Sequence, residues 1–212
     1  MKPLRFGLIA MTAAACISAF APNAAARLTA EDRADLGRIQ TKVNSFKTLQ
    51  TRFKQISPRG RISHGTIYIQ RPGQLRIQFD KKRLLVLTSR LWLIVIQGRR
   101  GRPQHFPLNS TPAGILVRSK VNFGGDIRVI GISRDERRIL VTIVRRKAPR
   151  QGRMTMIFDR EGLNLTGWTI VDSQGLLTRV LLSGTRLDVP LKPSLFYVPQ
   201  GRVRSGRNGG DR

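Results

Sequence analysis

Residues 74–80 alternate strictly between apolar and polar side chains, and this period of two constrains the fold more than any other feature. Leu75, Ile77 and Phe79 fall on one face, and the polar residues fall on the other. Successive side chains of a β-strand point to opposite faces of a sheet, so the pattern predicts a strand buried on one side. Strands of this kind are typical of antiparallel sheets.

Turn-forming residues separate this strand from others. Arg71-Pro72-Gly73 predicts a tight turn, so residues 62–70 and 74–80 should form a hairpin. Residues 84–96 are too few to span a bilayer, and Thr88-Ser89-Arg90 interrupts them, which predicts two short strands joined by a turn. Further strands are predicted at residues 127–132, 138–144, 153–158, 163–171, 176–182 and 195–198. This spacing indicates a mainly β protein with a meandering sheet or barrel.

Two helices are predicted beside the sheet. Thr29, with Asp32 three residues later, is a near relative of a capping box. The apolar stripe that follows consists of Leu36, Ile39, Val43 and Phe46. Residues 109–112 offer a cap and a proline, which predict a short helix that includes Ile115 and Leu116 and ends at Val117.

The first residues predict export. Two cations precede an apolar run, residues 6–20, that is too short to span a bilayer, and alanines 24–26 provide a cleavage site. We therefore expect a cleavable signal peptide over residues 1–26. A retained membrane anchor and lipidation at Cys16 are alternatives, which the short run and its continuation past Cys16 disfavour.

The remaining chain is long enough for one domain with a substantial core, which we expect over residues 27–201. Residues 202–212 are rich in glycine and arginine and predict a basic, disordered tail. Cleavage after residue 26 removes Cys16, the one cysteine of the chain. A disulfide, a thiol nucleophile and a thiolate metal site are then excluded.

The chain is strongly basic, with 39 Lys and Arg against 12 Asp and Glu and a net charge of +27. This charge favours acidic partners such as anionic lipid headgroups, lipopolysaccharide phosphates or nucleic acid, although it could also be a solvated surface adapted to the host environment. Trp92 and Trp168 lie within apolar strand patterns, where a core or cavity role is the default, so no base-stacking platform and no nucleic-acid partner is expected.

Residues that carry enzyme chemistry are poorly represented. His64 and His105 have no second ligand at a metal-binding spacing, and His64 is expected on the surface or barrel wall of a strand. The paired carboxylates fall in predicted turns. We therefore expect no enzyme, no metal and no cofactor.

Several short segments, taken in order, resemble the periplasmic outer-membrane lipoprotein carriers of the LolA family. They are residues 45–49, 53–55, 65–76, 108–112, 158–163, 171–175 with Thr178, and 191–196. The resemblance covers essentially the whole mature chain. It implies an incomplete antiparallel β-barrel, or curved sheet, closed by a helical lid around an apolar cavity.

The same resemblance implies a function. A monomeric periplasmic chaperone would bind lipoprotein acyl chains and shuttle them from an ATP-driven inner-membrane transporter to an acceptor lipoprotein of the outer membrane. Arg71 matches the arginine that holds the lid shut, and Ile115 and Leu116 would belong to the lid helix. The acyl-chain cavity would be lined by Leu75, Ile77, Phe79 and Trp92.

Two alternatives remain open on the residues alone. The face formed by Leu75, Ile77 and Phe79 could simply pack beneath the first helix as a closed core, because alternating strands form cores more often than cavities. The basic composition also fits an envelope protein that binds lipopolysaccharide or other polyanions through its surface.

Overall fold

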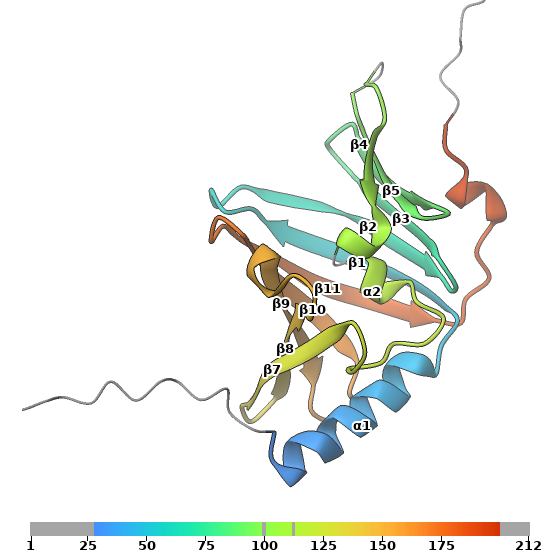
Figure 1. The fold of residues 1–212 in the computed structure, drawn as a ribbon. Coiled ribbons are helices and arrows are strands. Elements are labelled where there is room, and N and C mark those ends of the chain that lie inside the picture. The colour runs from blue at the N-terminus through green and yellow to red at the C-terminus, as the bar shows by residue number, and fades with distance from the viewer. Residues whose placement is uncertain (1–27, 99–100, 112, 200–212) are drawn as a thin grey trace, which may run out of the picture.

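A computed structural model describes residues 28–98, 101–111 and 113–199. The predicted signal peptide, the predicted tail and Pro112 lie outside the described residues. An antiparallel sheet of eleven strands dominates the fold (Figure 1). The strands are β1 (Thr48–Ile56), β2 (Ile62–Gln70), β3 (Gln74–Phe79), β4 (Leu84–Ser89), β5 (Trp92–Gln97), β6 (Gln104–Pro107), β7 (Ile127–Arg134), β8 (Arg138–Arg145), β9 (Gly152–Asp159), β10 (Leu165–Asp172) and β11 (Leu177–Leu187).

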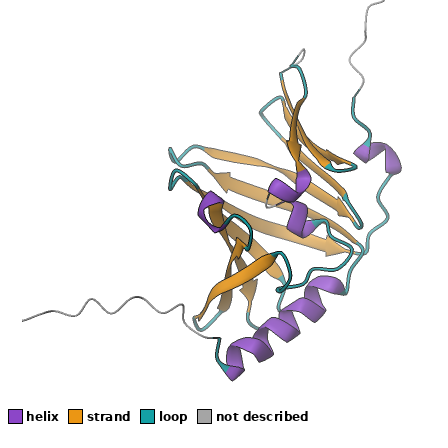
Figure 2. Cartoon of the chain, in the orientation of Figure 1, coloured by secondary structure: helices purple, strands orange, loops and turns teal. Residues whose placement is uncertain are grey.

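The strand order is β6-β5-β4-β3-β2-β1-β11-β10-β9-β8-β7. Each strand therefore pairs with its neighbour in sequence, except where β1 pairs with β11 and joins the two halves of the chain. β6 and β7 are the edges, so the sheet curves without closing (Figure 2). This confirms the expected mainly β fold with an incomplete antiparallel barrel.

Helix α1 (Ala30–Asn44) begins at the predicted capping box. The Thr29 hydroxyl accepts a hydrogen bond from the Asp32 N–H at 3.1 Å, and the Asp32 carboxylate accepts one from the Thr29 N–H at 2.9 Å. Ile39 and Val43 of the predicted stripe are buried. Because this stripe joins the sheet's main apolar core, α1 is fixed against the concave side of the sheet.

The second predicted helix is shorter than expected. A 3-10 turn, η1 (Leu108–Ser110), precedes α2 (Ala113–Leu116), and Val117 follows the helix instead of belonging to it. Ile115 and Leu116 are both buried in the same core as α1. Two further 3-10 turns, η2 (Pro149–Gln151) and η3 (Pro193–Phe196), lie outside the strands.

The predicted turn at Thr88-Ser89-Arg90 is wrong by two residues. Thr88 and Ser89 belong to β4, and the chain reverses at Arg90 and Leu91. The buried Thr88 hydroxyl donates a hydrogen bond to the carbonyl oxygen of Gly73 at 2.6 Å. It also accepts one from the N–H of Leu75 at 2.7 Å, so contacts with the β2–β3 hairpin hold Thr88 in the strand.

The predicted strand at residues 195–198 is also wrong, because the chain forms η3 there. Pro193 at the start of η3 has no N–H to donate to a sheet. The turn lies against β3 and β4, where Arg76 donates a hydrogen bond to the carbonyl oxygen of Leu195 at 2.9 Å. Phe196 is buried and Tyr197 is exposed, so this segment contributes one anchoring side chain instead of a strand face.

Candidate functional site: a divided apolar cavity

Three apolar spaces lie around α2, on the concave side of the sheet. The first is partly open to solvent and lies between α1, α2 and the strands, and among its lining residues are Val43, Phe46, Leu49, Ile69, Leu116, Val121, Met156 and Phe158. The second is lined by residues that include Phe53, Ile67, Leu75, Ile77, Leu93, Leu116, Trp168 and Val180. The third includes Ile115, Ile143, Met154 and Ile170 in its lining, with Arg145, Arg153 and Asp172 at its polar side.

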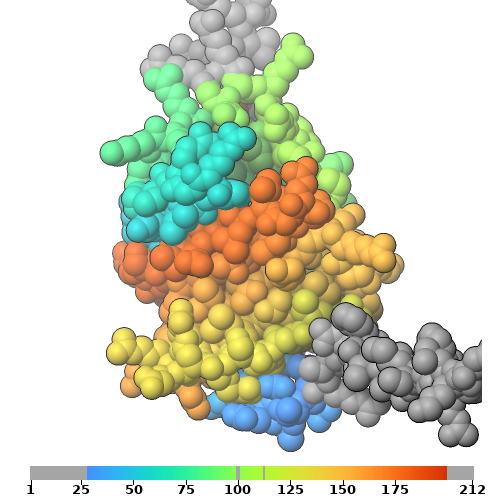
Figure 3. All heavy atoms as spheres, turned by 90° about the vertical axis from the view of Figure 1, so that its left-hand side faces the viewer, coloured from blue at the N-terminus to red at the C-terminus, as the bar shows by residue number. Residues whose placement is uncertain are grey.

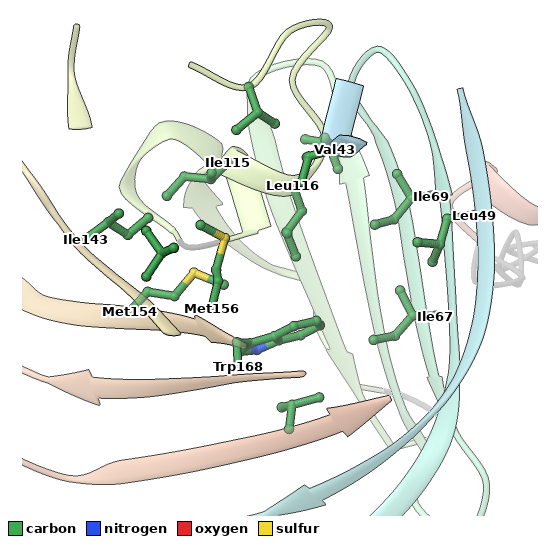
Figure 4. Close-up of a cluster of buried hydrophobic side chains, with 14 of the residues drawn as sticks. Val43, Leu49, Ile67, Ile69, Ile115, Leu116, Ile143, Met154, Met156 and Trp168 are labelled. Atoms are coloured by element: carbon green, nitrogen blue, oxygen red, sulfur yellow. The ribbon is translucent and has the colours of Figure 1, made fainter. Parts of the chain in front are cut away.

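Helix α2 separates these spaces. The Leu116 side chain lines the first and the second space, and the Ile115 side chain lines the first and the third. Figure 4 shows Leu116 pointing into the interior between Met156 and the β1 and β2 residues Leu49 and Ile69. One turn of helix therefore lies between the first space and each of the other two.

The Arg71 side chain connects α2 to α1 by hydrogen bonds. Its Nε donates a hydrogen bond to the carbonyl oxygen of Leu116 at 3.0 Å, and its Nη1 donates one to the carbonyl oxygen of Val43. The guanidinium lies 4.4 Å from the centre of the Phe46 ring, a cation–π contact. Partial burial lowers the pKa of Arg71, but an arginine side chain remains charged, so the two carbonyl oxygens partly satisfy a half-buried cation.

The β2–β3 turn places Arg71 beneath the helices. Its N–H donates a hydrogen bond to the carbonyl oxygen of Lys47 at 2.9 Å. Gly73 adopts a φ of +83°, which glycine tolerates, and its N–H donates to the carbonyl oxygen of Val117 at 2.8 Å. The turn predicted from Arg71-Pro72-Gly73 thus contacts the backbone that follows each of the two helices.

The structure separates the residues that were expected to line one cavity. Leu75 and Ile77 line the second space, whereas Phe79 packs edge-on against Phe53, with ring centres 5.1 Å apart. Trp92 is 46% exposed and packs against His105. Trp92 is not among the residues that line these spaces, because strand alternation directs its neighbour Leu93 inward instead.

Much of the opposite wall was not predicted from the sequence. Met154 and Met156 of β9 line the spaces from the second half of the sheet and face Ile67 and Ile69 of β2 (Figure 4). The alternation of residues 153–158 marks their inward face, but it does not say which strands lie opposite. Trp168, which was expected in the core or the cavity, lies in the wall of the second space.

Within the part of the chain that the structure describes, no group of three or more His, Cys, Asp or Glu could hold a metal ion. Over the same residues, no helix has the length and apolar character that crossing a membrane requires. His64, as expected, is exposed on the outside of β2.

Known proteins are similar to this chain in sequence. A sequence model of the family described as "Outer membrane lipoprotein carrier protein LolA" matches residues 44–199. An outer-membrane lipoprotein carrier protein of Methylococcus capsulatus is 25% identical over 170 residues, which cover 75% of this chain and 80% of that protein.

Two solved structures are also similar. The LolA superfamily protein NE2245 from Nitrosomonas europaea has a TM-score of 0.46 and 10% identity, and the match covers 77% of this chain and 97% of that one. The MucA/MucB complex of Pseudomonas aeruginosa has a TM-score of 0.45 and 15% identity, with 79% and 61% covered.

Proposed function

This chain belongs to the LolA family of outer membrane lipoprotein carrier proteins, and we propose that it binds lipoprotein acyl chains in the cavity that α2 divides. The observation that carries the proposal is the sharing of Leu116 and Ile115 between apolar spaces. Displacement of one helical turn would join these spaces into a single channel lined by aliphatic and aromatic side chains.

The lining suits an acyl chain physically. Each methylene moved from water into an apolar environment contributes about 0.8 kcal/mol, so a long tail needs a continuous apolar wall. The β-strands of the wall pair their backbone groups with one another, which leaves apolar side chains to face the ligand. A hydrocarbon tail offers no hydrogen bonds, and this wall requires none.

The finer steps of the proposal follow the resemblance to lipoprotein carriers. The protein would act in the periplasm as a monomer after its signal peptide has been removed. It would receive lipoproteins from an ATP-driven inner-membrane transporter and deliver them to an acceptor lipoprotein in the outer membrane. Arg71 would hold α2 closed until cargo arrives. LolA carriers bind and transport their cargo, and we propose that this chain likewise needs no catalytic residue and no cofactor.

Mass spectrometry of the lipids that copurify with the protein from the periplasm tests this function. We expect acylated lipoprotein or its acyl chains in the purified complex, and displacement of that cargo by a long-chain fluorescent fatty acid. A protein that copurifies with no acylated species and does not bind the fatty acid would have a closed core in place of a cavity, and the proposal would fail.

A further inference from the structure

The outer face of the sheet carries apolar side chains where an antiparallel sheet usually presents polar ones. Ile62 of β2 is 54% exposed, and Leu177 and Leu181 of β11 are 43% and 40% exposed. The strand register brings them together, because Ile56 of β1 pairs with Ile62 on one side and with Arg179 on the other. Figure 3 shows this side of the molecule, with β11 in orange beside the cyan end of the β1–β2 hairpin.

Cations lie between these apolar side chains. Arg179 is two residues from both Leu177 and Leu181, so it shares their face, and Lys54 is directly opposite Leu181 in the register. Arg179 and Lys54 are exposed, and within the described residues neither is paired with a carboxylate.

Two carboxylates on this part of the sheet already have partners. Asp80 forms an ion pair with Arg52 at 2.5 Å. Asp172, the last residue of β10, accepts hydrogen bonds from the N–H groups of Gln174 and Leu176, each at 2.9 Å. The charges of Arg179 and Lys54 therefore remain available to an anionic partner.

A basic hollow adjoins Ile62 at the end of the sheet. It is open to solvent and is lined by Arg52, Ile62, Ser63, His64, Asp80, Lys81 and Lys82. The pairing of Arg52 with Asp80 leaves the Lys81 ammonium group and the His64 ring to meet a ligand. The Lys82 ammonium group also lines the hollow and lies 5.7 Å from the centre of the Phe79 ring. Flexible ammonium groups around an open hollow suit a phosphate group that arrives on a mobile headgroup.

We propose that this outer face docks the protein on a membrane of anionic phospholipids. Lipid phosphates would meet Lys54, Arg179 and the hollow, while Ile62, Leu177 and Leu181 would enter the headgroup boundary. Apolar side chains interleaved with cations are the pattern of a surface that lies in the membrane interface. A second copy of this chain is a poor occupant, because it would place Lys54 and Arg179 against like charges.

Docking through this face would leave the cavity free to act. The face lies on the outside of the sheet, whereas α1, α2 and the three apolar spaces lie on the concave side (Figures 1 and 3). A docked protein would therefore stay close to the membrane while α2 remains accessible to a protein partner. Docking through this face does not depend on what the cavity binds.

Cosedimentation of the purified protein with vesicles tests the proposal. We expect binding to phosphatidylglycerol-containing vesicles, and little to pure phosphatidylcholine vesicles. Lys81→Gln with Lys82→Gln should weaken binding more than about tenfold, because each lysine near an anionic surface adds to the attraction. The double variant Ile62→Ser/Leu177→Ser should also weaken binding. Two double variants serve as controls, Arg33→Gln/Arg137→Gln for the lysines and Leu91→Ser/Ile130→Ser for the apolar residues. Their binding should stay within about twofold of the unmodified protein, since these exposed residues lie elsewhere.

Several results would overturn the docking surface. They are absence of binding to the anionic vesicles, an equal loss in the Arg33/Arg137 control, and full competition by inorganic phosphate at constant ionic strength. An equal loss in the control would mean that net charge alone attracts the protein, and phosphate competition would mean a site for the free ion. Binding of a fluorescent fatty acid, measured on the same variants, should not change and separates docking from cargo binding.

Discussion

Arg71 donates a hydrogen bond from Nε to the carbonyl oxygen of Leu116 over 3.0 Å, and the side chain of that same Leu116 divides the apolar interior. The residue that separates the spaces is thus held by its backbone from the β2–β3 turn. Since Arg71 also bonds to the carbonyl oxygen of Val43, movement of α2 away from the sheet would break its link to α1.

Replacement of Arg71 by leucine should loosen α2 while the fold is retained. The carbonyl oxygens of Leu116 and Val43 lose a charged donor, and each such hydrogen bond contributes about 1.5–3 kcal/mol. We expect faster hydrogen exchange at the Val117 N–H, which bonds to Ala113 within this segment, and altered cargo transfer to the acceptor. Arg76→Leu is the matched control, because Arg76 bonds to Leu195 instead. Unchanged exchange and transfer in Arg71→Leu would remove Arg71 from the mechanism.

Stability should fall in acid through the carboxylate that links α1 to β7. Asp35 is 3% exposed and accepts a hydrogen bond from Arg134 at 2.6 Å and another from Arg38. Burial raises the pKa of Asp35, but the hydrogen bonds from Arg38 and Arg134 outweigh it, so its pKa lies below the usual 3.8. Because the pKa of Asp35 is lower in the folded protein, the unfolded chain binds the proton more readily. The contribution of the ionised Asp35 to the free energy of unfolding is therefore complete above about pH 5 and is lost as pH falls through about 4 and below.

Urea unfolding of Asp35→Asn at several pH values measures this contribution. The variant should be less stable at pH 7 by about 1–2 kcal/mol, because the hydrogen bonds to a charged acceptor are lost while Arg134 keeps its ion pair with Asp32 at 2.8 Å. Its stability should also fall less steeply below pH 5. Glu136→Gln removes the same charge from an exposed turn and should follow the unmodified protein. Parallel pH curves for Asp35→Asn and the unmodified protein would contradict the prediction.

Local patterns were sufficient to predict most of the sheet. The alternation of residues 74–80 and the turn residues before it gave the β2–β3 hairpin, because both signals act between neighbours in the sequence. Thr88 was assigned to a turn because it begins the polar interruption of the apolar run. What holds it in β4 is distant in sequence, namely its hydrogen bonds to Gly73 and Leu75. The composition of residues 195–198 favours a strand, but the chain forms the 3-10 turn η3 there, which contacts β3 and β4.

The site was harder to predict than the fold. Resemblance pointed to Arg71, whose partners Val43 and Leu116 lie 28 and 45 residues away and carry no local signal. Trp92 was expected in the cavity because it lies within an apolar strand pattern, yet a shift of one residue in a strand exchanges its faces, and Leu93 lines the wall. The position of α2 between the apolar spaces could not be predicted, because it depends on how the two halves of the sheet lie relative to each other.

Gly65 should not tolerate a side chain. A Cβ atom there would lie 2.1 Å from the carbonyl oxygen of Gln78 and 2.6 Å from the Phe53 ring, which packs against Phe79 above the glycine. Gly65→Ala must therefore displace backbone or aromatic packing, and we expect a loss of about 3 kcal/mol in the free energy of unfolding by urea. Gly131→Ala, in β7, has no atom within 4 Å of the added Cβ and should change stability little. Equal stability of the two variants would contradict the prediction and would show that the contact between Phe53 of β1 and Phe79 of β3 can adjust to the added methyl group.

Leu116→Ala should open the partition between the first and second spaces. Deleting a buried leucine side chain costs about 2–5 kcal/mol, and here it also joins two apolar spaces into a longer one. We expect tighter binding of a long-chain fluorescent fatty acid and little change for a short-chain one, because only the long chain uses the added length. Val121→Ala is the matched control, since Val121 is buried and lines the first space without reaching the second. If Leu116→Ala and Val121→Ala changed the affinities for the long-chain and the short-chain fatty acid in the same way, a larger space alone would explain the effect. The separation of the two spaces by Leu116 would then have no role in binding.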